Sequence, residues 1–295
     1  MVRVAVLLLA VTLCRAATTL DSELAVGKSI NIFMRYGYLS ICMRVVPRND
    51  TDGWVFREPT VSVFRDVDRF ALAPKPRQAK RLFDGDFHME FCDNLKQLLQ
   101  AYFRDFSFER LERPWRAFTA GWPTDIMARN LGINASFING DHCYVLVRVS
   151  RFRETGKLSD LPSNIGVEDV VFDAIQDTEI GDMVSIADFI RKYGSHYISS
   201  YITGNSLYQV ASGNKTVENW ATKRLRVHYY IFSYPSLLKL HGEPALLRNL
   251  DTLLGNEALL QLELKTLSPA FRDVKKKKWF EEVIDNYLKL WESNM

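Results

Sequence analysis

Ser195 and His196 are the neighbouring residues whose types could do chemistry. A serine hydroxyl beside an imidazole is the pairing used in nucleophilic catalysis. In an extended segment adjacent side chains point to opposite faces, so the sequence predicts that these two side chains lie apart. The His-Glu-x-x-His and Gly-x-Ser-x-Gly patterns are also absent from the sequence. We therefore assign no catalytic residue and expect a protein that is not an enzyme.

A second group of residues has the types that bind zinc: His88, Cys92, His142 and Cys143. Ligands four residues apart share one face of a helix, but adjacent strand residues face opposite sides, which makes His142 and Cys143 a poor chelating pair. We expect packed histidines and a disulfide or buried thiol here, and no metal. Phosphate loops, dinucleotide glycine patterns and a carboxylate pair for glycoside chemistry are not found, so no cofactor is predicted.

The start of the chain predicts secretion. Arg3 precedes an apolar run over residues 4–13, and small residues follow Cys14. This is the pattern of a signal peptide, and its apolar run is shorter than the about 20 residues that span a bilayer. We expect residues 1–16 to be removed, leaving residues 17–295 as one domain with a short N-terminal extension and a C-terminal docking helix.

Cysteine, glycan and charge patterns agree with an extracellular protein. Without Cys14 the candidates for a disulfide are Cys42, Cys92 and Cys143, and the sequence leaves open all three pairs and an intermolecular bridge. Predicted glycosylation sites are Asn49, Asn134 and Asn214, each in an Asn-x-Ser/Thr triplet. The net charge of +3 falls to +1 when Arg3 and Arg15 leave, which does not favour nucleic acid. The basic run at residues 275–278 is either a solvated face or a contact for anionic lipid or glycan.

The Ser-His pair lies at a predicted junction between a helix and a strand. Ile186, Phe189, Ile190 and Tyr193 form one helical stripe, and Gly194 lies where a helix should end. From His196 the period changes to two, which indicates a strand. Further periodic patterns predict an α+β fold, with strands at residues 30–46, 61–64 and 142–153 and helices at residues 87–103, 123–131, 167–176, 184–193, 246–262 and 279–291.

The junction sequence Tyr193-Gly194-Ser195-His196-Tyr197 resembles the signature of the membrane attack complex/perforin (MACPF) family, which reads aromatic-Gly-Thr-His-aromatic. Ser195 replaces the threonine, and Ile186 stands where the family tends to carry a tyrosine. Gly204 falls where the family has the first glycine of a pair at the bend of its sheet. The resemblance extends from about Gly27 to the C-terminus.

This resemblance implies the MACPF fold, a bent, twisted antiparallel sheet flanked by two helix clusters. The signature residues then have a structural role: Gly194 permits the turn, Tyr193 and Tyr197 fill the core, and His196 hydrogen-bonds locally. A direct contact of these residues with a partner is the alternative.

Residues 106–115 and 131–144 are closely similar to an insect member of the family. That similarity implies a localised extracellular cue for a receptor tyrosine kinase in embryonic terminal patterning and developmental timing. The implied partners are extracellular proteins: the receptor pathway, its protein ligand, and vitelline membrane or other matrix components. The implied location is the eggshell or the cell surface.

A membrane-inserting or pore-forming effector is the alternative function. In pore-forming relatives the two helix clusters unwind into amphipathic hairpins, whose strands need about 9 to 11 alternating residues. The first helix cluster is expected within residues 87–131, and it carries charges in close succession. The second is expected within residues 216–262, where Pro235 interrupts the alternation. Lys or Arg near the bilayer midplane costs about 2 to 4 kcal/mol each, so the residues disfavour a pore. The crowded positions are Arg104, Glu109, Arg110, Glu112, Arg113 and Pro114.

Overall fold

A computed structural model describes residues 24–33, 61–73, 85–119, 122–139, 142–214 and 258–293. Within these residues seven strands form one sheet in the order β2-β1-β6-β5-β3, and β7 pairs with both β6 and β4. All pairings are antiparallel except that of β4 with β7. The strands are β1 (Lys28–Ile30), β2 (Val61–Ser62), β3 (Gly85–Cys92), β4 (Phe106–Phe108), β5 (His142–Lys157), β6 (His196–Asn214) and β7 (Ala258–Thr266).

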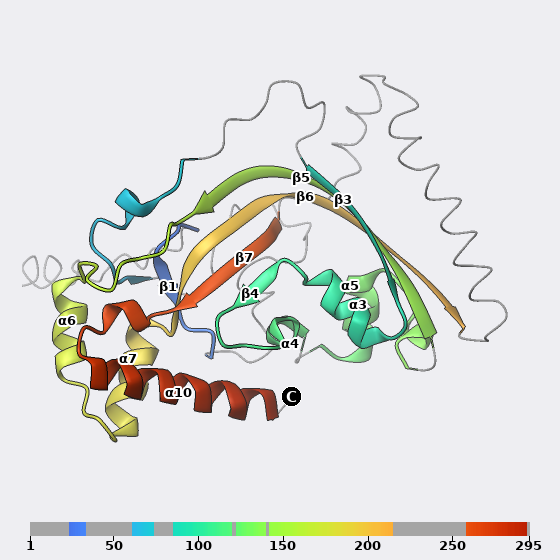
Figure 1. The fold of residues 1–295 in the computed structure, drawn as a ribbon. Coiled ribbons are helices and arrows are strands. Elements are labelled where there is room, and N and C mark those ends of the chain that lie inside the picture. Colours follow the sequence, from blue (N-terminus) through green and yellow to red (C-terminus); the bar gives the residue numbers. More distant parts are fainter. Residues whose placement is uncertain are drawn as a thin grey trace, which may run out of the picture.

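The longest strands, β5 and β6, run side by side and form an arch, with helices of the described fold beneath it (Figure 1). The register of β5 against β6 shifts between Phe152 and Thr155, and that of β6 against β7 shifts between Ile202 and Thr203. Such bulges bend a strand and increase its twist. The predicted bent, twisted antiparallel sheet with flanking helices is therefore confirmed.

One group of helices lies under one end of the arch (Figure 1): α3 (Leu95–Tyr102), α4 (Pro114–Thr119) and α5 (Thr124–Leu131). Its core is aromatic, because the ring of Phe118 stacks on Phe103 at 4.8 Å and meets Phe106 edge-on at 4.9 Å. Since Phe106 belongs to β4, which pairs with β7, this helix group is joined directly to the sheet.

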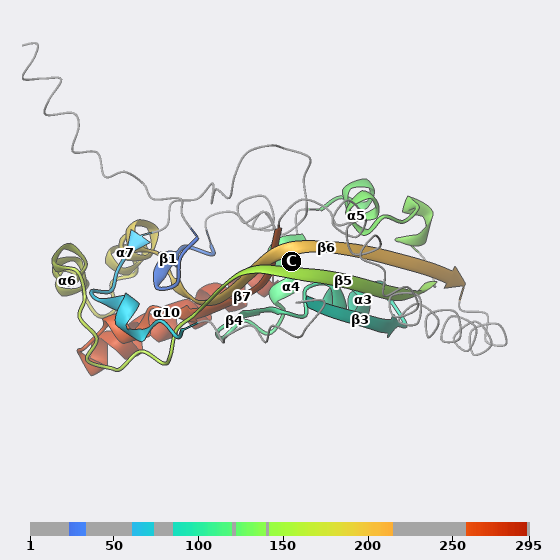
Figure 2. The same cartoon turned by 90° about the horizontal axis from the view of Figure 1, so that it is seen from above.

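The other group, at the opposite end of the arch, contains α6 (Asp169–Gln176), α7 (Met183–Tyr193) and α10 (Val274–Ser293), as Figures 1 and 2 show. The predicted stripe of α7 is buried, with exposed fractions of 0–5% for its four side chains. Phe189 from this stripe meets Phe271 at 5.2 Å and Phe280 of α10 at 6.2 Å. Short 3-10 turns complete the described fold at η1 (Val67–Phe70), η2 (Ala135–Phe137) and η3 (Ser268–Ala270).

Three predicted elements are wrong in part. The helix predicted over residues 87–103 is strand β3 followed by α3, because Asn94 accepts from the amide of Gln97 and begins the helix only there. The end of the helix predicted over residues 246–262 belongs to β7, in which the buried side chains of Leu262 and Leu264 alternate with the partly exposed Glu263. The residues Ser212-Gly213-Asn214 also predict a turn from their composition, but they are the end of β6 and pair with β5.

Several predictions fall outside the described residues: the signal peptide at residues 1–16, Cys42, Asn49, most of the strand region at 30–46, and Pro235 in the second cluster. In the part of the chain that is described, helices long and apolar enough to cross a bilayer are absent.

Candidate functional site

The signature residues lie where α7 turns into β6, and Gly194 makes that turn possible. Its φ is 91°, a value that L side chains rarely adopt. A Cβ at this position would lie 2.9 Å from the carbonyl carbon of Ile30 in β1. The amide of Gly194 still donates to the Ile190 carbonyl at 2.9 Å, which closes the helix. The predicted helix end is confirmed, and close approach of β1 is a second reason for glycine.

Strand β1 fastens the end of α7 through polar contacts. The Ser29 hydroxyl donates to the Tyr193 carbonyl at 2.5 Å, and the Asn31 amide donates to the Ile190 carbonyl at 3.2 Å. The amide of Ser195 in turn donates to the Ile30 carbonyl at 3.1 Å. The last carbonyls of a helix lack partners within the helix, so the Ser29 hydroxyl satisfies the Tyr193 carbonyl, which burial would otherwise leave unpaired. The Ile190 carbonyl already accepts from Gly194, and Asn31 is its second donor.

Ser195 and His196 form a hydrogen-bonded pair, which corrects the expectation that their side chains point apart. The Ser195 Oγ lies 2.9 Å from His196 Nδ1. The expectation assumed regular strand geometry, but residue 195 still belongs to the turn and only His196 begins β6. The local turn therefore brings together two side chains that a strand would separate.

The proton positions in this pair follow from their neighbours. His196 Nε2 lies 3.2 Å from the Glu109 carbonyl, which can only accept, so Nε2 carries the proton. Nδ1 is then the acceptor, and the Ser195 hydroxyl donates to it. The Ser195 Oγ also accepts from the amide of Ile32 at 3.2 Å. Each polar atom of the pair has a partner.

The pair is buried, with both residues 0% exposed. Burial lowers the pKa of His196 to about 4, and the nearby Arg110 charge also lowers it, against a smaller opposing effect of the bond to Glu109. The neutral imidazole of His196 stabilises the junction, because it accepts from the Ser195 hydroxyl and donates to the Glu109 carbonyl. In this arrangement a substrate would have no solvent route to the Ser195 hydroxyl.

The two signature tyrosines fill the core as the family resemblance implies. Tyr193 and Tyr197 are 5% and 2% exposed. The Tyr193 hydroxyl donates to the Val170 carbonyl of α6 at 3.1 Å, and the Tyr197 ring meets Phe64 edge-on at 5.3 Å. Burial also raises the pKa of Tyr197. Both rings therefore join the junction to its neighbours.

Glu109 and Arg110 belong to the site but were missed by sequence reasoning. The Glu109 carboxylate accepts from the Thr266 amide at 2.6 Å and from its hydroxyl at 3.0 Å. Arg110, with a φ of 68°, reaches Asp285 at 2.8 Å and Glu281 at 3.2 Å on α10. In the sequence these residues are part of a charged run with no local signal of such long-range contacts.

Gly204 lies at the bend of the sheet, opposite Phe152 and next to the register shifts. A Cβ at Gly204 would come within 2.0 Å of the Arg151 carbonyl oxygen. That distance is far below any real contact, so only glycine lets β5 approach β6 here. The lack of room for a Cβ is a structural reason for glycine at this position.

Among the described residues, the cysteines and histidines considered for disulfides or zinc form neither a disulfide nor a cluster of metal ligands. Cys92 and Cys143 are both buried and neither forms a disulfide in the described part of the chain. Burial also raises the pKa of Cys92 to about 12. His88 instead contacts Glu90 at 2.9 Å, and the described residues contain no cluster of three or more potential metal ligands.

Two of the predicted glycosylation sites fall within the described residues. Asn134 is exposed, and its side-chain oxygen accepts from the Ser136 amide at 3.0 Å. Asn214 is the last residue of β6 and pairs with His142. Glycosylation of either site stays a prediction.

Family models and curated protein sequences give no match to the chain. Among solved structures the chain is similar to a protein described as a cell invasion protein with a MAC/Perforin domain from Bacteroides thetaiotaomicron. The TM-score is 0.46 at 10% identity, covering 91% of this chain and 61% of that one. It is also similar to GNIP1Aa from Chromobacterium piscinae, with a TM-score of 0.44 at 10% identity, covering 90% of this chain and 57% of that one.

A third similar structure is Astrotactin-2, described as a vertebrate-specific and perforin-like membrane protein involved in neuronal development. Its TM-score is 0.39 at 17% identity, covering 83% of this chain and 97% of that one. The chain thus spans about 60% of the length of the two bacterial proteins. Because all three TM-scores lie below 0.5, these similarities assign no residue role, and the fold description rests on the chain's own sheet and helices.

Proposed function

We propose that the chain is a secreted, non-enzymatic MACPF protein, most similar to the insect protein Torso-like. In this proposal it acts as a localised extracellular cue for the receptor tyrosine kinase Torso in terminal patterning and developmental timing. Its partners are the Torso receptor pathway, a Trunk-like ligand, and vitelline membrane or matrix components. The motif and segment resemblances support this proposal.

One structural observation carries the non-lytic part of the proposal, namely the attachment of the first helix group to the sheet. β4 pairs in parallel with β7, with Phe106 opposite Leu262 and Phe108 opposite Leu264. Beside β4, the Asp105 carboxylate lies 2.5 Å from the guanidinium of Arg148, whose side chain is 5% exposed. Leaving the sheet would break both this strand pairing and the ion pair of a buried arginine, and the loss of a buried ion pair is strongly unfavourable.

The alternative, a membrane-inserting effector, requires that separation. The helix group between β3 and β5 would have to give up its aromatic core and place charged residues against lipid. The bent sheet supplies the framework for either function, so the difference lies in whether β4 remains paired.

A receptor activation assay tests the proposal. Insect cells that express Torso would be treated with a Trunk-like ligand, with and without the purified protein, and receptor phosphorylation would be measured. We expect phosphorylation to rise with protein concentration only when the ligand is present. Unchanged phosphorylation across the concentration series would overturn the signalling role.

A further inference from the structure

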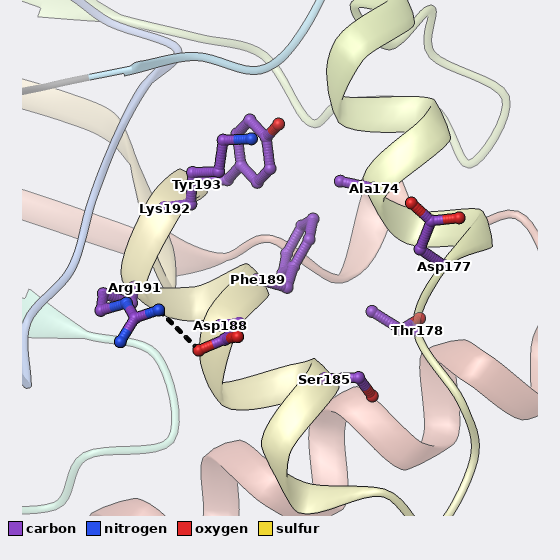
Figure 3. A pocket seen from close by; sticks show the side chains of 9 residues that line it. All are labelled: Ala174, Asp177, Thr178, Ser185, Asp188, Phe189, Arg191, Lys192 and Tyr193. Atoms are coloured by element: carbon purple, nitrogen blue, oxygen red, sulfur yellow. Dashed lines mark ion pairs between the residues drawn. The ribbon is translucent and has the colours of Figure 1, made fainter.

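The first half of helix α10 packs against α6 and α7. Phe280 of α10 meets Phe189 of α7 at 6.2 Å. In Figure 3 the ring of Phe189 points from α7 towards α6, beside a groove of about 530 Å³ between these two helices. The charged residues that line this groove are balanced in number: Asp177, Asp188, Arg191 and Lys192. The groove therefore has no net charge that would select a ligand.

The second half of α10 reaches the first helix group through Arg110, which lies between β4 and α4. The Arg110 guanidinium lies 2.8 Å from the Asp285 carboxylate and 3.2 Å from that of Glu281. These two acids are four residues apart and therefore share one face of the helix. At the end of α10 the Glu292 carbonyl accepts from Arg116 of α4 at 3.4 Å. Helix α10 thus contacts both helix groups, and Figure 1 shows it running from α6 and α7 towards α4.

The backbone of Arg110 has a conformation that its surroundings must support. Its φ of 68° lies in the left-handed region, which a residue other than glycine keeps only when neighbouring contacts fix it. The preceding residue, Glu109, is fixed by the sheet, because its carbonyl accepts from His196 at 3.2 Å and its carboxylate from the Thr266 amide at 2.6 Å. The turn after β4 is therefore held by the sheet on one side and by α10 on the other.

Apolar packing that does not involve Arg110 sets the position of α10. The ring of Phe33, which follows β1, meets Tyr287 at 5.5 Å and Trp291 at 6.0 Å. Ile284, on the same half of the helix, is 0% exposed. The ion pairs with Arg110, in contrast, join side chains that are 27–39% exposed. These ion pairs can therefore be broken while the helix stays packed.

We infer that α10 is a strap that holds the first helix group on the sheet. Its two carboxylates fix the turn after β4 through Arg110, and this turn keeps β4 paired with β7. Before the first helix group can leave the sheet, Arg110 has to separate from α10. The inference deepens the non-lytic part of the proposed function, in which β4 remains paired.

Hydrogen exchange of the purified protein, without lipid or receptor, tests the strap. Arg110→Gln removes both ion pairs with α10. We expect peptides covering residues 105–119 to exchange about threefold to tenfold faster, the range of two partly exposed ion pairs, while peptides from α6 and α7 keep their rates. The matched control is Lys278→Gln, because Lys278 lies 3.7 Å from Glu282 on the exposed side of the same helix. This control should leave the exchange of both helix groups unchanged.

A combined variant separates the strap from a general loss of stability. Glu281→Gln with Asp285→Asn removes the two carboxylates, and adding Arg110→Gln to this variant should speed exchange no further, because all three residues act through one contact. Unchanged exchange in Arg110→Gln would overturn the inference, as would faster exchange spread equally over both helix groups. Failure of the strap would leave receptor phosphorylation as it is, whereas failure of the signalling role would leave the difference in exchange in place.

Discussion

The two sides of α7 differ in how their polar groups are satisfied. On the side of β1, Ser195 and His196 are fully buried, and each polar atom of the pair has a partner. On the side of α6, the Asp177 carboxylate faces an open groove without a partner in the described residues. The polar groups of the Ser195–His196 pair are therefore all used within the fold, whereas the Asp177 carboxylate is not.

The difference shows that solvent exposure decides which polar groups of one helix need a partner within the fold. Unpaired polar groups are costly when buried, so every polar atom of the buried junction must find a partner there. An exposed carboxylate such as that of Asp177 remains hydrated and costs little. The Ser195–His196 pair therefore belongs to the framework of the fold, and Asp177 to its surface.

The largest expected effect is at the helix end, where two glycines with the same φ of 91° can be compared. Gly194→Ala places a Cβ against the backbone of Ile30, whereas Gly181→Ala meets nothing within 4 Å. We expect Gly181→Ala to lower the free energy of unfolding by about 1 to 3 kcal/mol from backbone strain, and Gly194→Ala to lower it further by about 2 kcal/mol or more. Urea unfolding measures both, and equal losses would mean that β1 does not constrain this turn.

His196 should make the folded state sensitive to acid. Its folded pKa of about 4 lies below the ordinary 6.5, so between these values the unfolded chain binds a proton that the folded protein excludes. Stability from this group is complete above pH 6.5 and is lost as the pH falls towards 4, by about 3 kcal/mol. Urea unfolding of the native protein and of His196→Gln at several pH values isolates this loss. An identical pH dependence in both proteins would contradict the buried neutral imidazole.

Removal of the Ser195 hydroxyl should have an intermediate effect. Ser195→Ala leaves His196 Nδ1 and the amide of Ile32 without their partner, at a cost of about 1 to 3 kcal/mol in the free energy of unfolding. Ser163→Ala, at an exposed turn and outside the predicted glycosylation triplets, is the control and should change stability little. Thermal unfolding of the pair measures the difference, and a neutral Ser195→Ala would argue that the hydroxyl is not needed for the junction.

The smallest expected effect on stability lies in the groove. Asp177→Asn should change the free energy of unfolding by no more than about 0.5 kcal/mol, because the carboxylate has no partner to lose among the described residues. The same urea unfolding experiment applies. A loss comparable to that of Ser195→Ala would show that Asp177 supports the fold and would remove the contrast between the two sides.

Much of the local structure could be predicted from the sequence. Apolar periodicity predicted the helical stripe through Phe189 and Tyr193 and the alternation of β5, and the glycine at position 194 predicted the helix end. The division of residues 87–103 into a strand and a helix was not, because the apolar positions of β3 also fit a helical period. Long-range contacts, such as that of Arg110 with α10, leave no signal in a single sequence.

The groove was also beyond sequence reasoning. Asp177 looks like any acidic residue after a helix, and its environment depends on the packing of α6 against α7. The Ser195–His196 contact was missed for a related reason, since strand geometry was assumed one residue too early. The periodicity of a sequence predicts helices and strands, but contacts between side chains of different elements can be identified only from the three-dimensional structure.

Hydrogen exchange of β4 in the presence of lipid vesicles tests most directly the central claim that this fold works without unfolding into a membrane. The ladder to β7 includes the Glu109 amide, which donates to the Leu264 carbonyl at 2.8 Å. We predict that peptides covering residues 105–109 exchange equally slowly with and without anionic vesicles. Rapid exchange of these peptides on addition of vesicles would contradict the claim and favour a membrane-inserting protein.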